Sequence, residues 1–450
     1  MRHLYHPTAL DPERPANSWW AESLTQAPAA YPELEGDHRT DVAIIGGGYT
    51  GLSAALHLTR DHHIEAQVLE RAFPGWGASG RNGGFCCMGS SKLAWSDVIA
   101  KFGRDDARAF YRAQVESVEL VGDLLTREGI DADRSGSGEY SLAHKPSVAA
   151  AFAGEVEFMA REFGARWTIL SRADLESRGM KGEGFHGAIR NPIGFGLNPM
   201  KYVTGLAKAA SRAGAKIAAK SPVNEWRREG NKHRLLTPKG SLLADRVLIA
   251  TNGYTPEDLH PDIGGRLLPA LSSVIATRPM TGAELAAQGW TSTDMAFDLR
   301  HLLHYFRLLP DGRMAFGGRG GLSAEPEALA RQSLRIEAAF RRYFPAWRDI
   351  EITHRWSGLV CLAKDVIPHV GKWDPEPETY FSLAYHGNGV AMASWAGRAI
   401  ANVIAGSPGD RGDERPNLMR RPPPRFPFPT LRPFYLRGAY ISYGIKDCLE

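Results

Sequence analysis

The sequence predicts a two-domain α/β fold, with one domain on a parallel, doubly wound sheet and a second α+β domain on a mostly antiparallel sheet. An apolar run at residues 42–45 leads through three glycines into an apolar helical pattern, and a second apolar run follows at 66–69. This order is typical of a strand–helix–strand unit with parallel strands. The length of 450 residues exceeds what one hydrophobic core usually serves, which favours two domains.

The three glycines have the spacing of a dinucleotide-binding turn, Gly46-x-Gly48-x-x-Gly51. We expect Gly46 to form the tight turn, Gly48 to let a pyrophosphate approach the backbone, and Gly51 to let the helix pack on the strand. The helix start would offer N–H groups and a positive dipole end to phosphates. Glu70 follows at roughly the 20-residue spacing of an acid that binds a ribose hydroxyl. This ordered set disfavours a glycine turn without a ligand.

The composition is that of an ordinary globular protein, with 43% hydrophobic and 23% charged residues. A net charge of +4 gives no reason to expect nucleic acid as a partner. The four cysteines fit no zinc pattern, so no metal site is predicted, and the adjacent Cys86 and Cys87 favour a reduced, cytoplasmic chain. No apolar run has the form of a signal peptide or the length of an integral membrane segment, so neither is expected.

The other elements follow from apolar spacing and turn residues. Trp19 and Trp20 lie in a Pro-rich lead and are expected to dock it on the protein body. The segment 266–350 predicts short strands and one helix, and the chain end predicts a docking helix, with a surface contact through Arg432 and Arg437 as the weaker alternative. The predicted helices are 104–127, 147–163, 173–178, 200–213, 325–343, 390–404 and about 433–448.

Two loops rich in small residues are placed to meet a ligand. Residues 75–84 follow the strand that ends at Glu70, and Arg81 and Asn82 add hydrogen-bond donors to a backbone that can lie close to a flat molecule. Residues 386–389 form a glycine turn before the helix at 390–404. This second strand, turn and helix can direct another set of N–H groups at an electron-rich ligand edge.

Taken together, these segments resemble the D-amino-acid-oxidase superfamily of FAD-dependent amine oxidoreductases, and most of all its γ-glutamylputrescine oxidase-like branch. The motifs that carry the resemblance occur in family order over nearly the whole chain. They are DVAIIGGGYTG from 41, LER at 69–71, GWGASGRNGG at 75–84, VLIATNGYT at 247–255, WSGLVCLAKDVIPHVG at 356–371 and HGNGVAMASWAGR at 386–398.

The resemblance implies a Rossmann-like FAD-binding domain of the glutathione-reductase type and non-covalent FAD. That domain would comprise 1–103, 191–265 and 351–420; the substrate domain would comprise 104–190 and 266–350, and 421–450 would be a Pro-rich segment with a docking helix. The implied catalytic residues are Tyr305, Trp356 and His386. The expected cofactor-binding residues are Gly46, Gly48, Tyr49, Thr50, Gly51, Glu70, Arg71, Ser79, Gly80, Arg81, Asn82, Gly83, Gly84, Val223, Thr251, Asn252, Gly253, Gly387, Asn388, Gly389 and Val390.

The reaction implied by the resemblance is hydride removal from a carbon beside an amine nitrogen, hydrolysis of the imine, and reoxidation by O2 to H2O2. Relatives that oxidise N-methyl amino acids place a Lys where this chain has Ala391, so a longer amine of the polyamine or γ-glutamyl-polyamine type is expected. Cys361 lies four residues before Asp365, which does not match the spacing for covalent flavin. Three alternatives stay open: a dehydrogenase that reduces a quinone or carrier protein, a nicotinamide dehydrogenase, and a non-catalytic binding subunit. The oligomeric state is left open.

Overall fold

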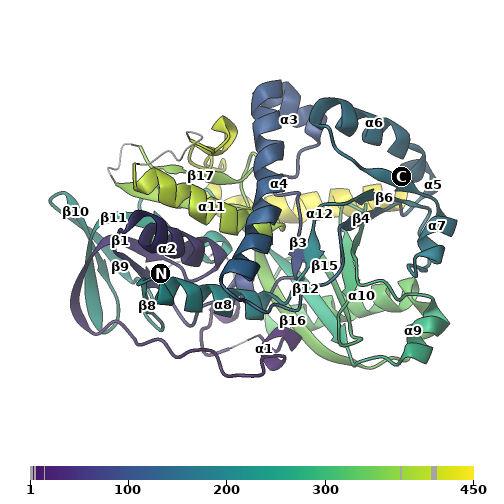
Figure 1. Ribbon diagram of the computed structural model, residues 1–450, viewed down its shortest axis with the longest axis horizontal. Helices are drawn as coiled ribbons and strands as arrows, with labels where there is room; N and C mark the ends of the chain where they lie inside the picture. Colours follow the sequence, from purple (N-terminus) through teal and green to yellow (C-terminus); the bar gives the residue numbers. More distant parts are fainter. Residues whose placement is uncertain (1–3, 5–6, 15, 375–377, 407–412, 450) are drawn as a thin grey trace.

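The computed structural model describes residues 4, 7–14, 16–374, 378–406 and 413–449 (Figure 1). Within them, eight strands form a first sheet in the order β17-β18-β11-β1-β2-β8, with β10 paired to β11 and β9 to β10. Its central pairs are parallel. The strands are β1 (Gly36–Ile45), β2 (Ala66–Leu69), β8 (Lys216–Ala218), β9 (Glu225–Glu229), β10 (Lys232–Leu236), β11 (Gly240–Ile249), β17 (His369–Lys372) and β18 (Thr379–Leu383).

Three helices pack together beside this sheet: α2 (Tyr49–His62), α8 (Pro199–Arg212) and α11 (Gly389–Ile404). The contact between α2 and α11 is close because small residues line it. A Cβ on Gly397 would lie 2.5 Å from the Thr50 carbonyl oxygen, and the Ser53 hydroxyl donates to the Ser394 carbonyl at 2.6 Å. The two helices therefore begin side by side, although about 340 residues of sequence separate them.

A second sheet of eight strands within the described residues has the order β16-β12-β15-β14-β13-β4-β6-β5 and is antiparallel except for β13 and β4. Helix α10 (Pro326–Tyr343) packs against β12, β15 and β16, with Phe306, Phe316 and Phe340 in the core between them. The strands are β4 (Glu139–Leu142), β5 (Thr168–Leu170), β6 (Ala188–Asn191), β12 (Leu268–Thr277), β13 (Met295–Asp298), β14 (His304–Leu308), β15 (Met314–Gly321) and β16 (Ile352–Leu362).

The remaining elements connect or cover the two sheets, and α4 runs between them in Figure 1. They are α1 (Trp19–Glu22), α3 (Trp95–Phe102), α4 (Arg104–Arg127), α5 (Pro146–Ala150), α6 (Phe152–Phe163), α7 (Arg172–Ser177), α9 (Gly282–Gln288), α12 (Arg432–Leu449), β3 (Phe85–Cys86), β7 (Phe195–Gly196) and the 3-10 turns Pro7–Ala9, Ala78–Gly80, Asn252–Tyr254, Pro345–Trp347, Asn417–Met419 and Pro429–Leu431. Among the helices of the described residues, none combines the length and apolar character that a membrane crossing requires.

Several helices depart from the sequence prediction: α3 was not predicted, the predicted helix 147–163 is divided into α5 and α6, and two short helices were missed although their caps were readable. The prediction of a single helix between 266 and 350 is wrong, because α9 also lies there. Its seven residues are too few to show an apolar period, yet its capping box was readable: the Thr281 side chain accepts from the Glu284 N–H, and Glu284 accepts from the Thr281 N–H. Helix α1 was missed for the same reason, and Ser18 caps it.

Both terminal segments contact the protein body within the described residues. Trp20 is 1% exposed and donates its indole N–H to the Asn82 carbonyl at 2.8 Å. In α12, Leu436 is buried against Leu268 and Ala270. Arg432 is also buried and donates to the Glu257 carboxylate, so of the two arginines predicted for a surface contact only Arg437 is exposed, and that contact stays a prediction. The domain boundaries remain a prediction, and β16, which they assign to the first domain, pairs with β12 in the second sheet.

Candidate active site

The turn after β1 needs glycine for two separate reasons. Gly46 has φ +113°, and a Cβ there would lie 2.8 Å from the Ala250 carbonyl oxygen at the end of β11. A Cβ on Gly51 would overlap the Gly46 carbonyl oxygen. Both glycines thus let α2 begin close to the ends of β1 and β11, where a parallel sheet places its ligands.

The start of α2 is the first group of donors in the site. Its N-cap is Gly48, which has no side chain to satisfy the free N–H groups of the first turn. Ser79 takes up one of them, since its hydroxyl oxygen accepts from the Tyr49 N–H at 3.0 Å. A Cβ on Gly48 would lie 2.8 Å from that oxygen, so the space beside Gly48 accommodates Ser79 as well as any phosphate.

Glu70 occupies the position expected of a ribose-binding acid. Its Oε2 accepts from the Gly47 N–H at 2.6 Å and its Oε1 from the Ala72 N–H at 3.0 Å. Burial raises the pKa of this carboxyl, and the two backbone donors partly offset that rise. The glycine turn and the acid are therefore held as one unit, with the carboxyl group at the cavity wall.

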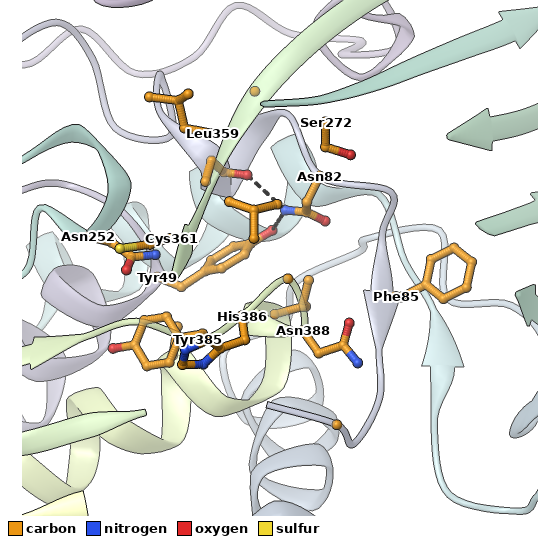
Figure 2. Close-up of a pocket in the computed structure, with 18 of the residues that line it drawn as sticks. Tyr49, Asn82, Phe85, Asn252, Ser272, Leu359, Cys361, Tyr385, His386 and Asn388 are labelled. Carbon is orange, nitrogen blue, oxygen red and sulfur yellow. Dashed lines mark hydrogen bonds between the residues drawn. The ribbon is translucent and has the colours of Figure 1, made fainter. Parts of the chain in front are cut away.

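The second glycine turn is tied to the first. The Thr50 and Tyr385 hydroxyls are 2.8 Å apart, and Tyr385 also bonds Ser382 at 2.9 Å. Figure 2 shows Tyr385, His386 and Asn388 together at the start of α11, opposite Tyr49 and Asn82. Because α11 has no side-chain cap at Asn388, its first N–H groups form a second set of donors beside the first.

Both ring nitrogens of His386 are occupied by protein. Nε2 accepts from the Ala363 N–H at 3.1 Å, and Nδ1 lies 3.1 Å from the Ser90 carbonyl, to which it can only donate. Burial, reinforced by Lys92, lowers the pKa of His386 to about 3, which keeps the ring neutral. This geometry favours a positioning role for His386 over proton transfer.

The loop at 79–84 is held from three distant elements. The indole N–H of Trp356 donates to the Arg81 carbonyl at 2.8 Å, Trp20 donates to Asn82, and Arg307 Nε donates to the Gly83 carbonyl at 3.2 Å. Arg307 is 1% exposed, and burial lowers its pKa to about 10. The alternating pattern of 302–307 made Arg307 a possible substrate residue, but its support of Gly83, 224 residues away, was not predicted.

These parts line one cavity of about 860 Å³ that extends from the glycine turn to the second sheet. It contains most of the predicted site residues: Gly46, Gly48, Tyr49, Thr50, Glu70, Arg71, Ser79, Arg81, Asn82, Gly83, Val223, Thr251, Asn252, Tyr305, His386, Gly387, Asn388, Gly389 and Val390. Five others do not line it: Gly51, Gly80, Gly84, Gly253 and Trp356. The last group lies one layer behind, where a Cβ on Gly80 or Gly84 would overlap backbone oxygens and Trp356 supports Arg81.

The wall of this cavity fits a dinucleotide. Among the described residues, Arg81 Nη2 and Trp76 Nε1 are buried beside the cavity without a protein partner, so both can donate to a ligand. Two uncapped helix starts add backbone donors suited to phosphate and to a flavin ring edge. Glu70 adds a carboxyl group at the cavity wall, which can accept hydrogen bonds from the hydroxyls of a ribose.

Comparison with protein families shows which family of enzymes the chain belongs to. The family model described as FAD dependent oxidoreductase (DAO) matches residues 41–403, which include both glycine turns. The chain belongs to this family. FAD is therefore its cofactor, and the predicted alternative of a nicotinamide dehydrogenase is wrong. When bound, FAD would meet the start of α2, Glu70, the 79–84 loop and the 386–389 turn.

Relatives of this oxidoreductase cover nearly its whole length. It is 31% identical over 444 residues to a probable oxidoreductase OrdL of Rhizobium meliloti (strain 1021), with 98% of this chain and 99% of the relative covered. It is 30% identical over 439 residues to the gamma-glutamylputrescine oxidoreductase of Escherichia coli (strain K12), with 96% and 98% covered. The crystal structure of glycine oxidase from Geobacillus kaustophilus aligns with TM-score 0.69 at 21% identity, covering 86% and 99% of the chains. The predicted FAD-binding fold is thus confirmed.

The cavity also carries charged residues that the sequence prediction missed. Lys92, Glu139 and Arg319 all line it, from the loop before α3, from β4 and from β15. Lys92 lies in a segment of small residues and Arg319 in a glycine-rich strand, so neither shows a pattern in the sequence. The fold brings them together.

Proposed function

We propose that this oxidoreductase oxidises the C–N bond of an elongated amine, of the polyamine or γ-glutamyl-polyamine type, and passes the electrons to O2. The observation that carries the proposal is the apolar part of the cavity lining. Besides the loops suited to FAD, the lining includes the apolar side chains of Phe158, Trp167 and Phe297. Such walls suit a long alkyl chain, and one relative acts, by its name, on gamma-glutamylputrescine.

Bound FAD would supply the hydride acceptor for the carbon beside the amine nitrogen. The protein then needs to orient the substrate and exclude water. Tyr305 suits this task, since its ring lies against Gly83 and its hydroxyl is 3.1 Å from the Ser272 hydroxyl. Burial raises the pKa of Tyr305, so the phenol stays neutral and can donate or accept one hydrogen bond. Trp356 and His386 would position the loops on either side.

The proposed overall reaction balances with oxygen and water: a primary amine, O2 and H2O give an aldehyde, ammonia and H2O2. From the sequence, Ala391 in place of a lysine is a reason to expect a longer amine, but the structure gives this residue no role in substrate choice. Ala391 is fully buried in α11 and does not line the cavity, so a side chain at this position would not reach a ligand without rearrangement. The apolar lining of the cavity is the stronger reason to propose a long amine.

We also propose that FAD is held without a covalent bond and that the chain works in the reducing cytoplasm. Cys86, Cys87 and Cys361 are free and buried, and burial raises the pKa of the Cys361 thiol well above its usual value. A protonated thiol is a poor nucleophile toward flavin. Acid precipitation that releases all the FAD into solution would support the first proposal, and flavin retained on the protein would refute it.

The test of the function is an anaerobic screen of amines, polyamines, γ-glutamyl amines and amino acids that follows the loss of oxidised-flavin absorbance. The proposal expects bleaching by elongated amines, followed by recovery and H2O2 formation when air is admitted. Bleaching without peroxide in air would instead indicate a dehydrogenase that needs a quinone or carrier protein. Bleaching only by D-amino acids would refute the substrate class, and failure of every amine would favour a non-catalytic subunit.

A further inference from the structure

We propose that Lys92 and Arg319 determine specificity by binding a carboxylate of the substrate, an inference that rests on the proposed amine oxidation. Both side chains line the same cavity as the FAD-binding loops, and Arg319 lies beside the 386–389 turn. Within the part of the chain that the structure describes, neither forms an ion pair with an acid. The pair would therefore select amines that also carry an acid group over plain diamines and polyamines.

The backbone on both sides fixes these cations in place. The loop before Lys92 is anchored because Gln114 Oε1 accepts from the Gly89 N–H at 2.6 Å and from the Ser90 N–H at 3.1 Å. The Lys92 N–H itself donates to the Val366 carbonyl at 3.1 Å. Its side chain is then free to extend into the cavity, and its exposed surface faces that space.

Arg319 approaches the same space from β15. Its Nη2 is 3.4 Å from the His386 carbonyl, a long and weak hydrogen bond, and a Cβ on Gly387 would lie 2.9 Å from that nitrogen. The guanidinium therefore lies beside the turn that begins α11, with most of its donor capacity unused by the described residues.

The charges in this part of the cavity do not balance without a ligand. Burial and the neighbouring Arg319 lower the pKa of Lys92 to about 7, and burial raises the pKa of Glu139 to about 7. Glu139 interacts with the Cys87 thiol and, electrostatically, with Lys92, but among the described residues no ion pair within 4 Å joins Glu139 to Lys92. Two basic side chains, Lys92 and Arg319, thus line the cavity with one acidic side chain, Glu139, and a bound carboxylate would balance the second basic group.

The test uses the FAD-loaded enzyme and glutarate, a dicarboxylate without an amine, and measures binding from the change in flavin absorbance and by calorimetry. We expect wild type to bind glutarate, and Lys92→Met to bind it roughly 10- to 100-fold more weakly, as expected for loss of a charged hydrogen bond. Arg319→Lys should retain part of the affinity that Arg319→Met loses. Lys208→Met, an exposed lysine of α8 outside the cavity, is the matched control and should bind like wild type.

A turnover comparison separates this inference from the proposed function. Wild type should prefer a γ-glutamyl diamine to the same diamine carrying an N-acetyl group, which lacks the carboxylate, and Lys92→Met should lose that preference while its FAD content and melting temperature stay unchanged. Glutarate that fails to bind, or binds wild type and Lys92→Met equally, would overturn the inference. If glutarate binding depends on Lys92 but no amine bleaches the flavin, the carboxylate site stands and amine oxidation fails.

Discussion

Replacing Gly397 by alanine tests whether close packing of α11 on α2 holds the two helix starts together. A Cβ at this position would lie 2.5 Å from the Thr50 carbonyl oxygen, 2.7 Å from Ser53 Cβ and 2.9 Å from the Ala54 nitrogen. Real Cβ contacts below 3.0 Å essentially do not occur, so α11 must move away from α2 by at least roughly 0.5 Å. Backbone atoms form the obstacle, so a side-chain rotation cannot relieve it.

The energetic balance of this substitution can be bounded. Alanine gains about 0.5–1 kcal/mol over glycine inside a helix, whereas overpacking costs about 1–3 kcal/mol. We therefore expect a net loss of about 1–2 kcal/mol of stability. The displacement also moves the starts of both helices, where Thr50 and Tyr385 are bonded, so FAD should bind roughly tenfold more weakly.

The assay is titration of the apoprotein with FAD, following quenching of flavin fluorescence, together with chemical denaturation. Gly154→Ala is the matched control: this glycine lies in α6, and a Cβ there would meet no atom within 4 Å, so the variant should gain up to about 1 kcal/mol and bind FAD normally. If Gly397→Ala were as stable as Gly154→Ala and bound FAD with wild-type affinity, the packing argument would be refuted.

Three further predictions follow from named contacts. Trp20→Phe removes the N–H that bonds the Asn82 carbonyl and should weaken FAD binding by about 1 kcal/mol in the same titration, whereas Trp19→Phe, whose ring packs on His354 and Arg313, should not. Asp298 is fully buried and accepts from Tyr343, His304 and Arg300, and because these partners outweigh burial its pKa is lowered to about 2 from 3.8. Its stabilising contribution should therefore disappear as pH falls from about 4 to 2. In chemical denaturation, Asp298→Asn should cost about 3–5 kcal/mol of stability, whereas Asp311→Asn, which removes an exposed ion pair with Arg313, should cost less than about 1 kcal/mol. The affinity for glutarate should fall as pH rises through about 7, because Lys92 loses its proton and Glu139 becomes charged over the same range. Cys87 and Arg319 are the neighbouring titratable groups of this pair. A glutarate affinity that stays constant in calorimetry from pH 6 to 8 would contradict this prediction.

Features that depend on local sequence could be predicted well. Helix α4 has the predicted bounds 104–127 and strand β2 the predicted bounds 66–69, because apolar spacing and flanking glycines are encoded within each segment. The two glycine turns were found for the same reason. Strand β1 begins earlier than the apolar run, at Gly36, because its exposed first residues gain backbone pairing with 240–243 rather than burial.

Features that depend on long-range contact could not be read from the sequence. Arg307 supports Gly83 from a strand of the other sheet, and nothing near either residue signals the pairing. Trp356 lies in a motif that predicts a site residue, but its indole N–H donates to the Arg81 carbonyl and its side chain lies one layer behind the cavity. Lys92 and Arg319 meet only because the loop before α3 and strand β15 face the same space.

The central claim is that the start of α2 and the start of α11 hold two parts of one FAD molecule. A crystal structure of the FAD-loaded enzyme measures this directly. We predict the pyrophosphate within hydrogen-bond distance of the backbone N–H groups at 48–50 and the flavin ring against the 386–389 turn. A flavin bound elsewhere, or one in contact with only one of the two helix starts, would contradict the account.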